Sequence, residues 1–382
     1  MNINQSSCRY ETRFLTPAEV DHRLVAAWAD LEKRAIYPNA FLSPYFVLPA
    51  LKYLVPAEAC FGIFIEKLSA GSRDLVGVAW FQTRRPNRRF PLPHLAAFLS
   101  IHSYLSDFLI DQSCAAEVQA HLYQTLRHTK QIWHGLYINN ASQEILWNEQ
   151  AQDAAREQHI RWHGVEEWER AILFPQEAET TLTSYIPKRR QKNYQKNLKR
   201  LEEHGVIEWA VQMNAPNAFQ SSLEDFLRVE HSGWKKENGT SLLSNPHEAN
   251  FFREMMNGFH RAGRAYLTEI RLNRQVIAST ANIISAEVGF ALKIGWDNAY
   301  AEYGLGIINE IKFIQHLAQC PSLTYIDGCT APDSYINEFW PGRRKLCEGW
   351  FSLTLLGEAA LQAVQNAKKL KSALRSRLKS SQ

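Results

Sequence analysis

Residues 288–296, Val-Gly-Phe-Ala-Leu-Lys-Ile-Gly-Trp, and the following Tyr303-Gly304-Leu305-Gly306 are the stretch from which the fold can be predicted. In the first segment, bulky apolar residues alternate with small residues and one lysine, a period of two that is typical of a half-buried β-strand. After the glycines, apolar residues return at helical spacing, which predicts an amphipathic helix. They are Ile307, Ile308, Ile311, Ile314 and Leu317. The stretch therefore predicts a strand, a glycine turn and a helix in succession.

The predicted strand has one face of small residues, Gly289, Ala291 and Gly295, apart from Lys293. Another backbone or an extended ligand could lie close against such a face. The helix that follows the glycines would present free N–H groups and the positive end of its dipole, which suits a phosphate. The plainer interpretation is a glycine turn before an ordinary helix, because Gly-x-Gly alone is a weak motif.

Composition indicates a folded protein with more than one domain. A chain of 382 residues favours two domains, and 45% hydrophobic residues with 12% aromatic residues suffice for packed cores. The net charge of +4 identifies no nucleic-acid partner, and we expect no DNA binding. The six cysteines include no C-x-x-C pair, so we expect neither a disulfide framework nor a metal site. Neither a secretory signal nor a membrane-spanning segment is visible, which predicts a cytoplasmic protein.

The polar segment 175–187 marks a predicted boundary between two halves. We expect an N-terminal domain over residues 1–175, a second domain over 176–356, and a basic amphipathic helix over 357–382. Each half gives helices, meandering strands, a helix and a further strand, which indicates a duplicated architecture. In the first half, the position that matches the glycine turn reads Asp111-Gln112-Ser113-Cys114. Because it has no glycine, we expect only the second half to hold a phosphate.

The second half carries segments that resemble a known family. The order of its elements is that of the GNAT acyltransferase fold, and Ser232-Gly233-Trp234-Lys235-Lys236-Glu237-Asn238-Gly239-Thr240 resembles an element of the GNAT-related, CelD-like cellulose-biosynthesis proteins. Further similar segments are Lys293–Asp297, Tyr303–Gly306, Asp327–Asp333 and Trp340–Arg344. The tandem halves are distantly similar to the Fem-type peptidyltransferases. The resemblance implies an α/β (α+β) chain of two tandem GNAT-like domains, each a mixed, mostly antiparallel sheet flanked by helices, the first of them degenerate.

The resemblance also implies an activity. A GNAT-type enzyme would move an acyl group, with acetyl expected, from acyl-CoA to an amine or hydroxyl of a small-molecule or envelope-polysaccharide precursor, without a metal. One alternative is a Fem-type transferase that uses aminoacyl-tRNA. Another is a non-enzymatic protein of polysaccharide assembly, which remains open because Tyr300-Ala301-Glu302 stands where GNAT enzymes carry an Arg or Gln.

Candidate site residues follow from these segments. The closing element offers Asp333 and Asp327 as proton acceptors, although a strand-end aspartate such as Asp327 often only caps a turn. Lys293, in mid-strand, would need a carboxylate, a phosphate or a substrate acid if it were buried, and a structural ion pair is the alternative. The residues expected to bind the acyl donor are Leu292, Ile294, Tyr303, Gly304, Leu305 and Gly306. Those expected to contact the acceptor are Trp234, Lys235, Trp340 and Arg343, although large aromatic residues more often fill cores.

Two segments are strongly basic. Residues 188–200 hold seven cations and no acid, which predicts either a solvated helix face or the binding of an anionic partner, phosphate or RNA. The C-terminal helix carries a second group of cations and an apolar stripe. It could dock on the domain or contact an anionic membrane surface.

Overall fold

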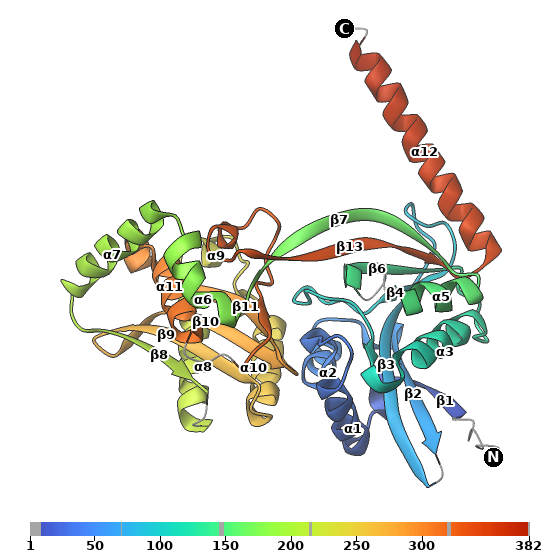
Figure 1. Ribbon diagram of the computed structural model, residues 1–382, viewed down its shortest axis with the longest axis horizontal. Coiled ribbons are helices and arrows are strands. Elements are labelled where there is room, and N and C mark those ends of the chain that lie inside the picture. The colour runs from blue at the N-terminus through green and yellow to red at the C-terminus, as the bar shows by residue number, and fades with distance from the viewer. Residues whose placement is uncertain (1–8, 70, 145–148, 214–215, 319–321, 381–382) are drawn as a thin grey trace. The chain divides into compact units, whose positions relative to one another are not determined.

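The computed structural model describes residues 9–69, 71–144, 149–213, 216–318 and 322–380 (Figure 1). The chain forms two compact units, neither of which is continuous in sequence. Unit 1 contains residues 1–42, 56–167 and 345–382, and unit 2 contains residues 43–55 and 168–344. Within each unit the strands pair in a mixed, mostly antiparallel order and are flanked by helices, in line with the predicted fold class.

The sheet of unit 2 has the strand order β7-β12-β11-β10-β9-β8. Its neighbouring strands are antiparallel except for β11 and β12, which run parallel. The strands are β7 (Arg161–Leu173), β8 (Ile207–Gln212), β9 (Ala265–Leu272), β10 (Gln275–Ser285), β11 (Val288–Trp296) and β12 (Tyr325–Asp327). A parallel pair needs a crossover, and the glycine turn with its helix supplies the crossover here.

Helices cover both faces of this sheet (Figure 1). Successive side chains of a strand point to opposite faces, and the side chains of Ile294 and Trp296 approach Gly306, at the start of α11, whereas Gly295 lies against the backbone of Glu230 in α8. The two helices therefore lie on opposite faces of β11. The helices of unit 2 are α2 (Pro44–Tyr53), α6 (Ala178–Thr180), α7 (Lys188–Glu202), α8 (Pro216–Glu230), α9 (Trp234–Glu237), α10 (Pro246–Arg261) and α11 (Leu305–Leu317).

Strand β11 begins and ends as predicted, but its side chains do not alternate throughout. Ala281 of β10 lies opposite Lys293, and the next residue, Asn282, lies opposite Ala291, so Leu292 is an extra residue in a β-bulge. The bulge reverses the alternation. Ala291 consequently packs against the core cluster beside α11, and not on the face of Gly295 as the simple pattern predicts.

Unit 1 contains the strand order β1-β2-β3-β4-β6-β13. One face of this sheet packs against α3 and α5 in a core that includes Phe81, Leu95, Leu136 and Phe351. The strands are β1 (Arg9–Leu15), β2 (Cys60–Ser69), β3 (Ser72–Arg84), β4 (His94–Ala97), β5 (Leu109–Ile110), which pairs with β3, β6 (Gly135–Ser142) and β13 (Gly342–Ser352). The helices are α1 (His22–Lys33), α3 (Ala115–Arg127), α5 (Glu149–Glu157) and α12 (Leu355–Ser380).

The units differ from the predicted domains at three places, the smallest of which is the boundary, which falls at 167/168 and not at 175/176. Residues 43–55 belong to unit 2, where Phe46 of α2 packs edge-to-face on Phe251 and Lys52 forms an ion pair of 2.7 Å with Glu254. Residues 345–382 belong to unit 1, because β13 pairs there with β6 and Leu361 of α12 packs with Phe90 and Trp350. Both exchanges depend on contacts between residues far apart in sequence, which a division by composition does not detect.

The predicted C-terminal helix is present as α12 and begins slightly earlier, at Leu355. None of the helices in the described part of the chain is both long enough and apolar enough to cross a membrane.

Candidate functional site

The parallel strands β11 and β12 separate after a short pairing. They are in register over only three residues, from Val288 opposite Tyr325 to Phe290 opposite Asp327. Strand β12 ends there, whereas β11 continues to Trp296 and contains the bulge at Leu292. The edge of β11 from Ala291 onward thus has no partner strand on the β12 side within the described chain, and its backbone groups on that side do not pair with a strand.

The glycine turn stands beside this open edge. Gly304 has φ +62° and ψ 47°, a left-handed conformation that favours glycine, and α11 begins at the next residue. The N–H groups of Leu305 and Gly306 find no acceptor among the described residues, since the first turn of a helix lacks internal partners. A Cβ on Gly306 would lie 3.4 Å from the Tyr335 hydroxyl and 3.8 Å from Ile294. This helix start is therefore walled by β11 and by the segment that follows β12.

A buried carboxylate lies one helical turn beyond the glycine. Glu310 is four residues after Gly306, so both lie on the same side of α11. Its side chain is only 6% exposed and accepts a hydrogen bond of 2.9 Å from Trp340 Nε1. Burial raises the pKa of Glu310 to about 7, although the hydrogen bond from Trp340 opposes the shift. A carboxyl group with such a pKa can accept a proton near neutral pH.

Two tyrosine hydroxyls lie near this carboxylate. Burial and the charge of Glu310 raise the pKa of both Tyr266 and Tyr335, so both phenols stay protonated at neutral pH. The hydroxyl of Tyr266 is buried without a hydrogen-bond partner among the described residues. An unpaired buried hydroxyl is costly and usually marks a place for water or a ligand. We call Gly306, Glu310, Tyr335, Tyr266 and Trp340 the Glu310 cluster.

The orientation of α11 is fixed by the residue before Glu310. Asn309 is 1% exposed, and its side-chain oxygen accepts hydrogen bonds of 3.1 Å from both Trp209 Nε1 and Thr268 Oγ1. These bonds connect α11 to β8 and β9. Glu310 is consequently held in place by the sheet beneath the helix.

The two predicted aspartates have different surroundings. Asp327 is fully buried, and its carboxylate oxygens lie 3.5 Å from Arg170 Nη1 and 3.1 Å from Arg344 Nη1. It also accepts a 2.9 Å hydrogen bond from the backbone of Cys329. Such an ion-paired turn carboxylate matches the structural alternative for Asp327. Asp333 is exposed in the turn that precedes the 3₁₀ helix Tyr335–Glu338.

The two predicted lysines lie on the α8 side of β11. Lys235 Nζ donates a 2.7 Å hydrogen bond to the carbonyl of Ile294 and lies 3.3 Å from the buried Glu230 carboxylate. Gly295 allows this close approach, because a Cβ there would lie 2.5 Å from Glu230 Cα. The small face of the strand thus accommodates another backbone, one of the two predicted uses. Burial lowers the pKa of Lys293, and Glu230 and Glu248 partly oppose this.

The remaining predicted residues have structural contacts. Tyr303 bonds to His204 at 2.7 Å, and the Arg200 guanidinium lies 5.0 Å from its ring centre. Arg343 donates to the carbonyls of Trp340 and Gly342 at 2.6 and 2.7 Å. Trp340 is 1% exposed, so it contributes to the site mainly through its bond to Glu310. The side chain of Trp234 lies outside the described residues.

Helix α7 presents a single positive face. Its apolar and half-buried residues pack on η8 (Asn298–Tyr303) and α11. Arg190 and Arg200 form ion pairs of 2.7 Å with Glu338 and Glu302. The other cations are exposed and, at 3.6 residues per turn, fall within an arc of about 100° on the opposite side. They are Lys188, Arg189, Lys192, Lys196 and Lys199.

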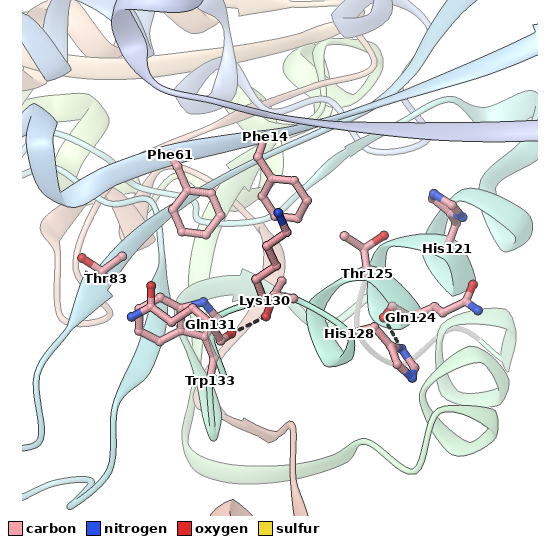
Figure 2. Close-up of a pocket in the computed structure, with 11 residues that line it drawn as sticks. Phe14, Phe61, Thr83, His121, Gln124, Thr125, His128, Lys130, Gln131 and Trp133 are labelled. Carbon is pink, nitrogen blue, oxygen red and sulfur yellow. Dashed lines mark hydrogen bonds between the residues drawn. The ribbon is translucent and has the colours of Figure 1, made fainter.

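A larger hollow, of about 840 Å³, lies in unit 1 between β1, β2 and the end of α3 (Figure 2). Phe14, Phe61 and Trp133 make it largely apolar, and no carboxylate lines it. By size alone, this hollow would be chosen as the candidate functional site. We assign the candidate site to the Glu310 cluster because free helix N–H groups, an unpaired strand edge and a buried carboxylate meet there, a combination that we find nowhere else in the described part of the chain.

Sequence reasoning located the strand and the glycine turn but missed Glu310, Tyr335 and Tyr266. A signal for Glu310 was present, since it falls among Ile307, Ile311 and Ile314 on the apolar stripe of the predicted helix. A charged residue on the buried, apolar face of a helix is rarely found without a partner or a function, so it is a candidate site residue. No comparable signal marks Tyr335 or Tyr266, which only the fold brings to α11.

Residues 188–335 match the family model of the acetyltransferase (GNAT) domain. No characterised protein among the curated sequences matches the chain. Among solved structures, FemX is similar with a TM-score of 0.56 and 11% identity, over 92% of this chain and 99% of that chain. The C-terminal domain of a putative lysylphosphatidylglycerol synthetase from Agrobacterium fabrum has a TM-score of 0.51 and 12% identity, over 91% and 95% of the two chains.

These comparisons confirm the predicted fold class, a mixed α/β chain with GNAT-like, tandem-like architecture. They support a GNAT-type domain in the second half of the chain. They do not confirm the predicted membership of the CelD-like family. At 11–12% identity the similarity to solved structures concerns the fold alone.

Proposed function

We propose that unit 2 is an N-acyltransferase of the GNAT type that takes its acyl group, acetyl in the simplest case, from acyl-CoA. The observation that carries this proposal is the Glu310 cluster beside the open edge of β11. Acyl transfer needs an anchor for the donor's phosphates, a donor of hydrogen bonds to the thioester oxygen and a proton acceptor. When bound, acyl-CoA supplies the activated acyl group as a thioester.

The residues present fit such a donor. The free N–H groups of Leu305 and Gly306, with the dipole of α11 behind them, suit a pyrophosphate. The bulged Leu292 and its neighbour Ile294 belong to the part of β11 without a partner strand, so their backbone can contact an extended chain. The orphaned hydroxyl of Tyr266 indicates room for a further polar group near Glu310.

Within this proposal, Glu310 accepts the proton from the attacking amine or hydroxyl. Its pKa of about 7 lets it be ionised in a large fraction of molecules at neutral pH and still hold a proton afterward. Asp333, exposed after β12, is the rival proton acceptor. Asp327 and Lys293 are proposed to shape the site, the first through its arginine pairs. An envelope-polysaccharide precursor, as in CelD-like proteins, is the proposed acceptor class, and a cytoplasmic location is its natural setting.

Donor binding can be tested by calorimetry with acetyl-CoA and CoA. Gly306→Ala adds a methyl group in ordinary contact with its neighbours and should change affinity little. Gly306→Leu would project into the space beside Tyr335 and should weaken binding at least tenfold while the fold persists. Equal affinity in the Leu variant would place the donor elsewhere. A wild-type chain that binds no CoA would contradict acyl-CoA dependence.

Proton transfer can be tested by the pH profile of thiol release from acetyl-CoA with a panel of amino sugars. The wild-type rate should rise with pH through about 7, the pKa of Glu310. Glu310→Gln should remove this limb and lower turnover by about 10²–10⁴-fold. Asp333→Asn is the matched comparison. If Asp333→Asn removes the limb and Glu310→Gln does not, Asp333 is the acceptor.

The positive face of α7 favours a second candidate, a Fem-type transferase that takes its acyl group from aminoacyl-tRNA. Reversal of Lys192, Lys196 and Lys199 to Glu should then weaken tRNA binding, most strongly at low salt. Reversal of Lys368 and Lys369 in α12 provides a comparison at the second basic segment. A mobility shift with tRNA but no binding of acetyl-CoA would favour this candidate. A chain that binds neither would favour the non-enzymatic assembly role.

A further inference from the structure

Unit 1 has a second hollow, built on the sheet face opposite its apolar core. Four neighbouring strands contribute one residue each to a continuous row: Gln82 of β3 lies opposite Ala96 of β4, which pairs with Tyr137 of β6, which pairs with Trp350 of β13. Arg84 and His94 form a second pair, two residues farther along β3 and β4. Side chains two residues apart share a face. All of these residues line one hollow of about 300 Å³.

The opposite face of the same strands is apolar, as expected for a sheet face that packs against helices. Phe81, Leu95, Leu136 and Phe351 alternate with the row and fill the core under α3 and α5. On the hollow's side, Gln82 and His94 are 4% and 3% exposed, although both are polar. Both are hydrogen-bonded to backbone carbonyls, Gln82 to Leu99 and His94 to Leu92, as buried polar groups usually are, and they give the hollow a polar lining.

The hollow also lies at an irregularity of the sheet. The register of β13 against β6 shifts between Cys347, opposite Ala141, and Gly349, opposite Ile138. Asn140 has φ +58°, an uncommon conformation for a residue other than glycine. Asn139, next to it, lines the hollow. Bulges and strained residues of this kind are frequent beside functional sites, where they redirect a side chain.

The lining groups have complementary chemistry. Arg84 and Arg89 are exposed cations at the hollow, and neither forms an ion pair with an acidic side chain in the described chain. Gln82 is bonded within the chain, to Arg84 and to the carbonyl of Leu99, so the groups open to a ligand are the amide N–H groups of Asn87, the Asn139 amide and the Tyr137 phenol, whose pKa is raised by burial and by Glu348. Trp350, stacked on Phe90 at 4.9 Å between ring centres, supplies an apolar wall.

His94 is held in place at the base of the hollow. Its Nδ1 lies 2.9 Å from the carbonyl of Leu92, and its ring meets Trp350 edge-on at 5.1 Å between centres. Burial lowers the pKa of His94, and Arg84 adds to this. The imidazole is therefore neutral at pH 7, and the positive charge of the hollow comes from its two arginines.

We propose that this hollow binds a small, hydroxylated anion, of the kind represented by sugar acids and sugar phosphates. Arg84 and Arg89 hold the carboxylate or phosphate, since guanidinium groups match the geometry of both. The amide N–H groups of Asn87, the Asn139 amide and the Tyr137 phenol bind the hydroxyl groups, and Trp350 contacts the apolar face of the ring. A volume of about 300 Å³ suits a single ring rather than a nucleotide or a polymer. The proposal stands independently of the activity proposed for unit 2.

The test is calorimetry on the full chain with glucuronate, glucose 6-phosphate, glucose and inorganic phosphate. We expect glucuronate or glucose 6-phosphate to bind at least tenfold more tightly than glucose and than inorganic phosphate. Whichever of the two binds shows whether the anionic group is a carboxylate or a phosphate. No binding by either sugar anion would overturn the proposal. Equal binding of inorganic phosphate would overturn the hydroxylated ligand class.

The sequence offers a matched pair of variants. Arg84→Gln with Arg89→Gln removes the two cations of the hollow, and Arg85→Gln with Arg88→Gln removes two cations of the same exposed loop that do not line it. The first double variant should weaken binding at least tenfold and the second less than twofold. Equal losses in both would show only general electrostatic attraction and would overturn the site. Ala96→Leu, which fills the floor of the hollow, should abolish binding of the sugar anion, with thermal unfolding as the check on folding.

Discussion

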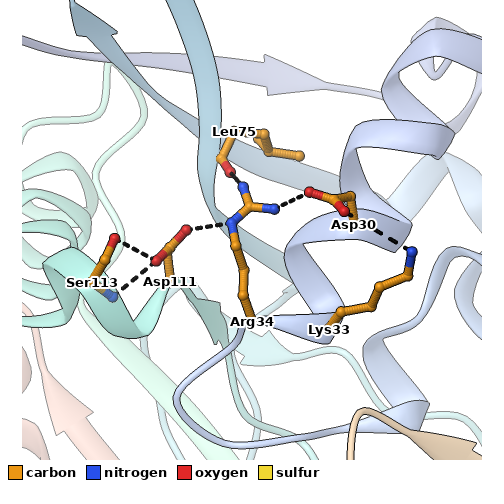
Figure 3. A network of polar contacts seen from close by, with 6 residues as sticks. All are labelled: Asp30, Lys33, Arg34, Leu75, Asp111 and Ser113. Atoms are coloured by element: carbon orange, nitrogen blue, oxygen red, sulfur yellow. Dashed lines mark hydrogen bonds and ion pairs between the residues drawn. The ribbon is translucent and has the colours of Figure 1, made fainter.

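The two units differ in the segments that lead into α11 and α3. In unit 2, α11 follows Gly304 and leaves the N–H groups of Leu305 and Gly306 without acceptors in the described chain. In unit 1, the segment leading into α3 starts at Asp111, whose carboxylate accepts 2.9 Å and 2.7 Å hydrogen bonds from the backbone and hydroxyl of Ser113 (Figure 3).

The difference bears on the anion site proposed at the start of α11. Arg34 Nε lies 2.5 Å from the second Asp111 oxygen and also bonds to the carbonyl of Leu75 at 2.7 Å (Figure 3). Unit 1 therefore places a carboxylate of its own at the 3₁₀ turn Gln112–Cys114, which leads into α3, and a cation neutralises it. Unit 2 leaves the start of α11 open and puts its buried carboxylate, Glu310, one turn farther along. At these two segments, only unit 2 leaves N–H groups open within the described chain, and the predicted phosphate at its glycine turn stays a prediction.

The largest effect should come from Asp327, a buried carboxylate that, like Asp111, is paired with arginine. Asp327→Ala would leave Arg170 and Arg344 without the carboxylate that lies between them, at a cost of about 3–5 kcal/mol of unfolding free energy. Asp333→Ala, six residues later and exposed, is the control and should change stability by less than about 0.5 kcal/mol. Urea unfolding measures both. Exposed salt bridges contribute up to about 1 kcal/mol to the unfolding free energy. If Asp327→Ala lowers that free energy by less than this amount, the buried ion pairs contribute little.

The next effect concerns Glu310, whose pKa is raised from 4.5 to about 7. Between these pH values the unfolded chain is ionised at this residue while the folded chain stays largely protonated, so stability falls as pH rises through this window. The loss is on the order of 3 kcal/mol at most. Glu310→Gln should remove this part of the pH dependence, whereas Glu203→Gln, at an exposed position, should not. Parallel pH–stability curves for the wild type and Glu310→Gln would contradict the buried site.

A smaller effect is expected at Asp111. Burial opposes ionisation, but hydrogen bonds from Ser113 and the charge of Arg34 hold the pKa of Asp111 below its usual value. Its contribution is therefore present above pH about 4 and is lost as pH falls further. Asp111→Asn should cost about 1–2 kcal/mol at pH 7, because Arg34 is partly exposed. The difference in unfolding free energy between Asp111→Asn and the wild type should become smaller below pH about 4. A difference that persists at low pH would assign the loss to packing.

The smallest effect distinguishes the two glycines of the open helix start. Gly304→Ala places a side chain at φ +62° and should cost about 1 kcal/mol. Gly306→Ala lies within the helix, where its methyl group meets only ordinary contacts, and should be neutral or stabilising by up to about 1 kcal/mol. Thermal unfolding measures both. Equal losses would show that the turn tolerates neither substitution and that Gly304 is not specifically required.

Local pattern predicted much of the fold because the relevant forces act between near neighbours. Alternation located β11 at its true ends, and residue type and spacing located α7 and α11 within a few residues. The bulge at Leu292 was not predictable, because the alternation of residue types continues through it and only pairing with β10 reveals the extra residue. The assignment of α2 to unit 2 likewise depends on its contacts with α10, two hundred residues away in sequence.

The sequence by itself determined the strand, the glycine turn, the basic face of α7 and the absence of glycine at Asp111. These follow from residue type and spacing, which set backbone conformation and amphipathic faces. The tertiary structure alone decided which charged groups are buried and what they meet. It pairs Asp327 with two arginines, brings Tyr266 and Tyr335 to Glu310, and joins four strands of unit 1 into one polar hollow. The physical reason is that pKa shifts and ion pairing depend on burial and distance, which long-range strand pairing sets and local sequence does not encode.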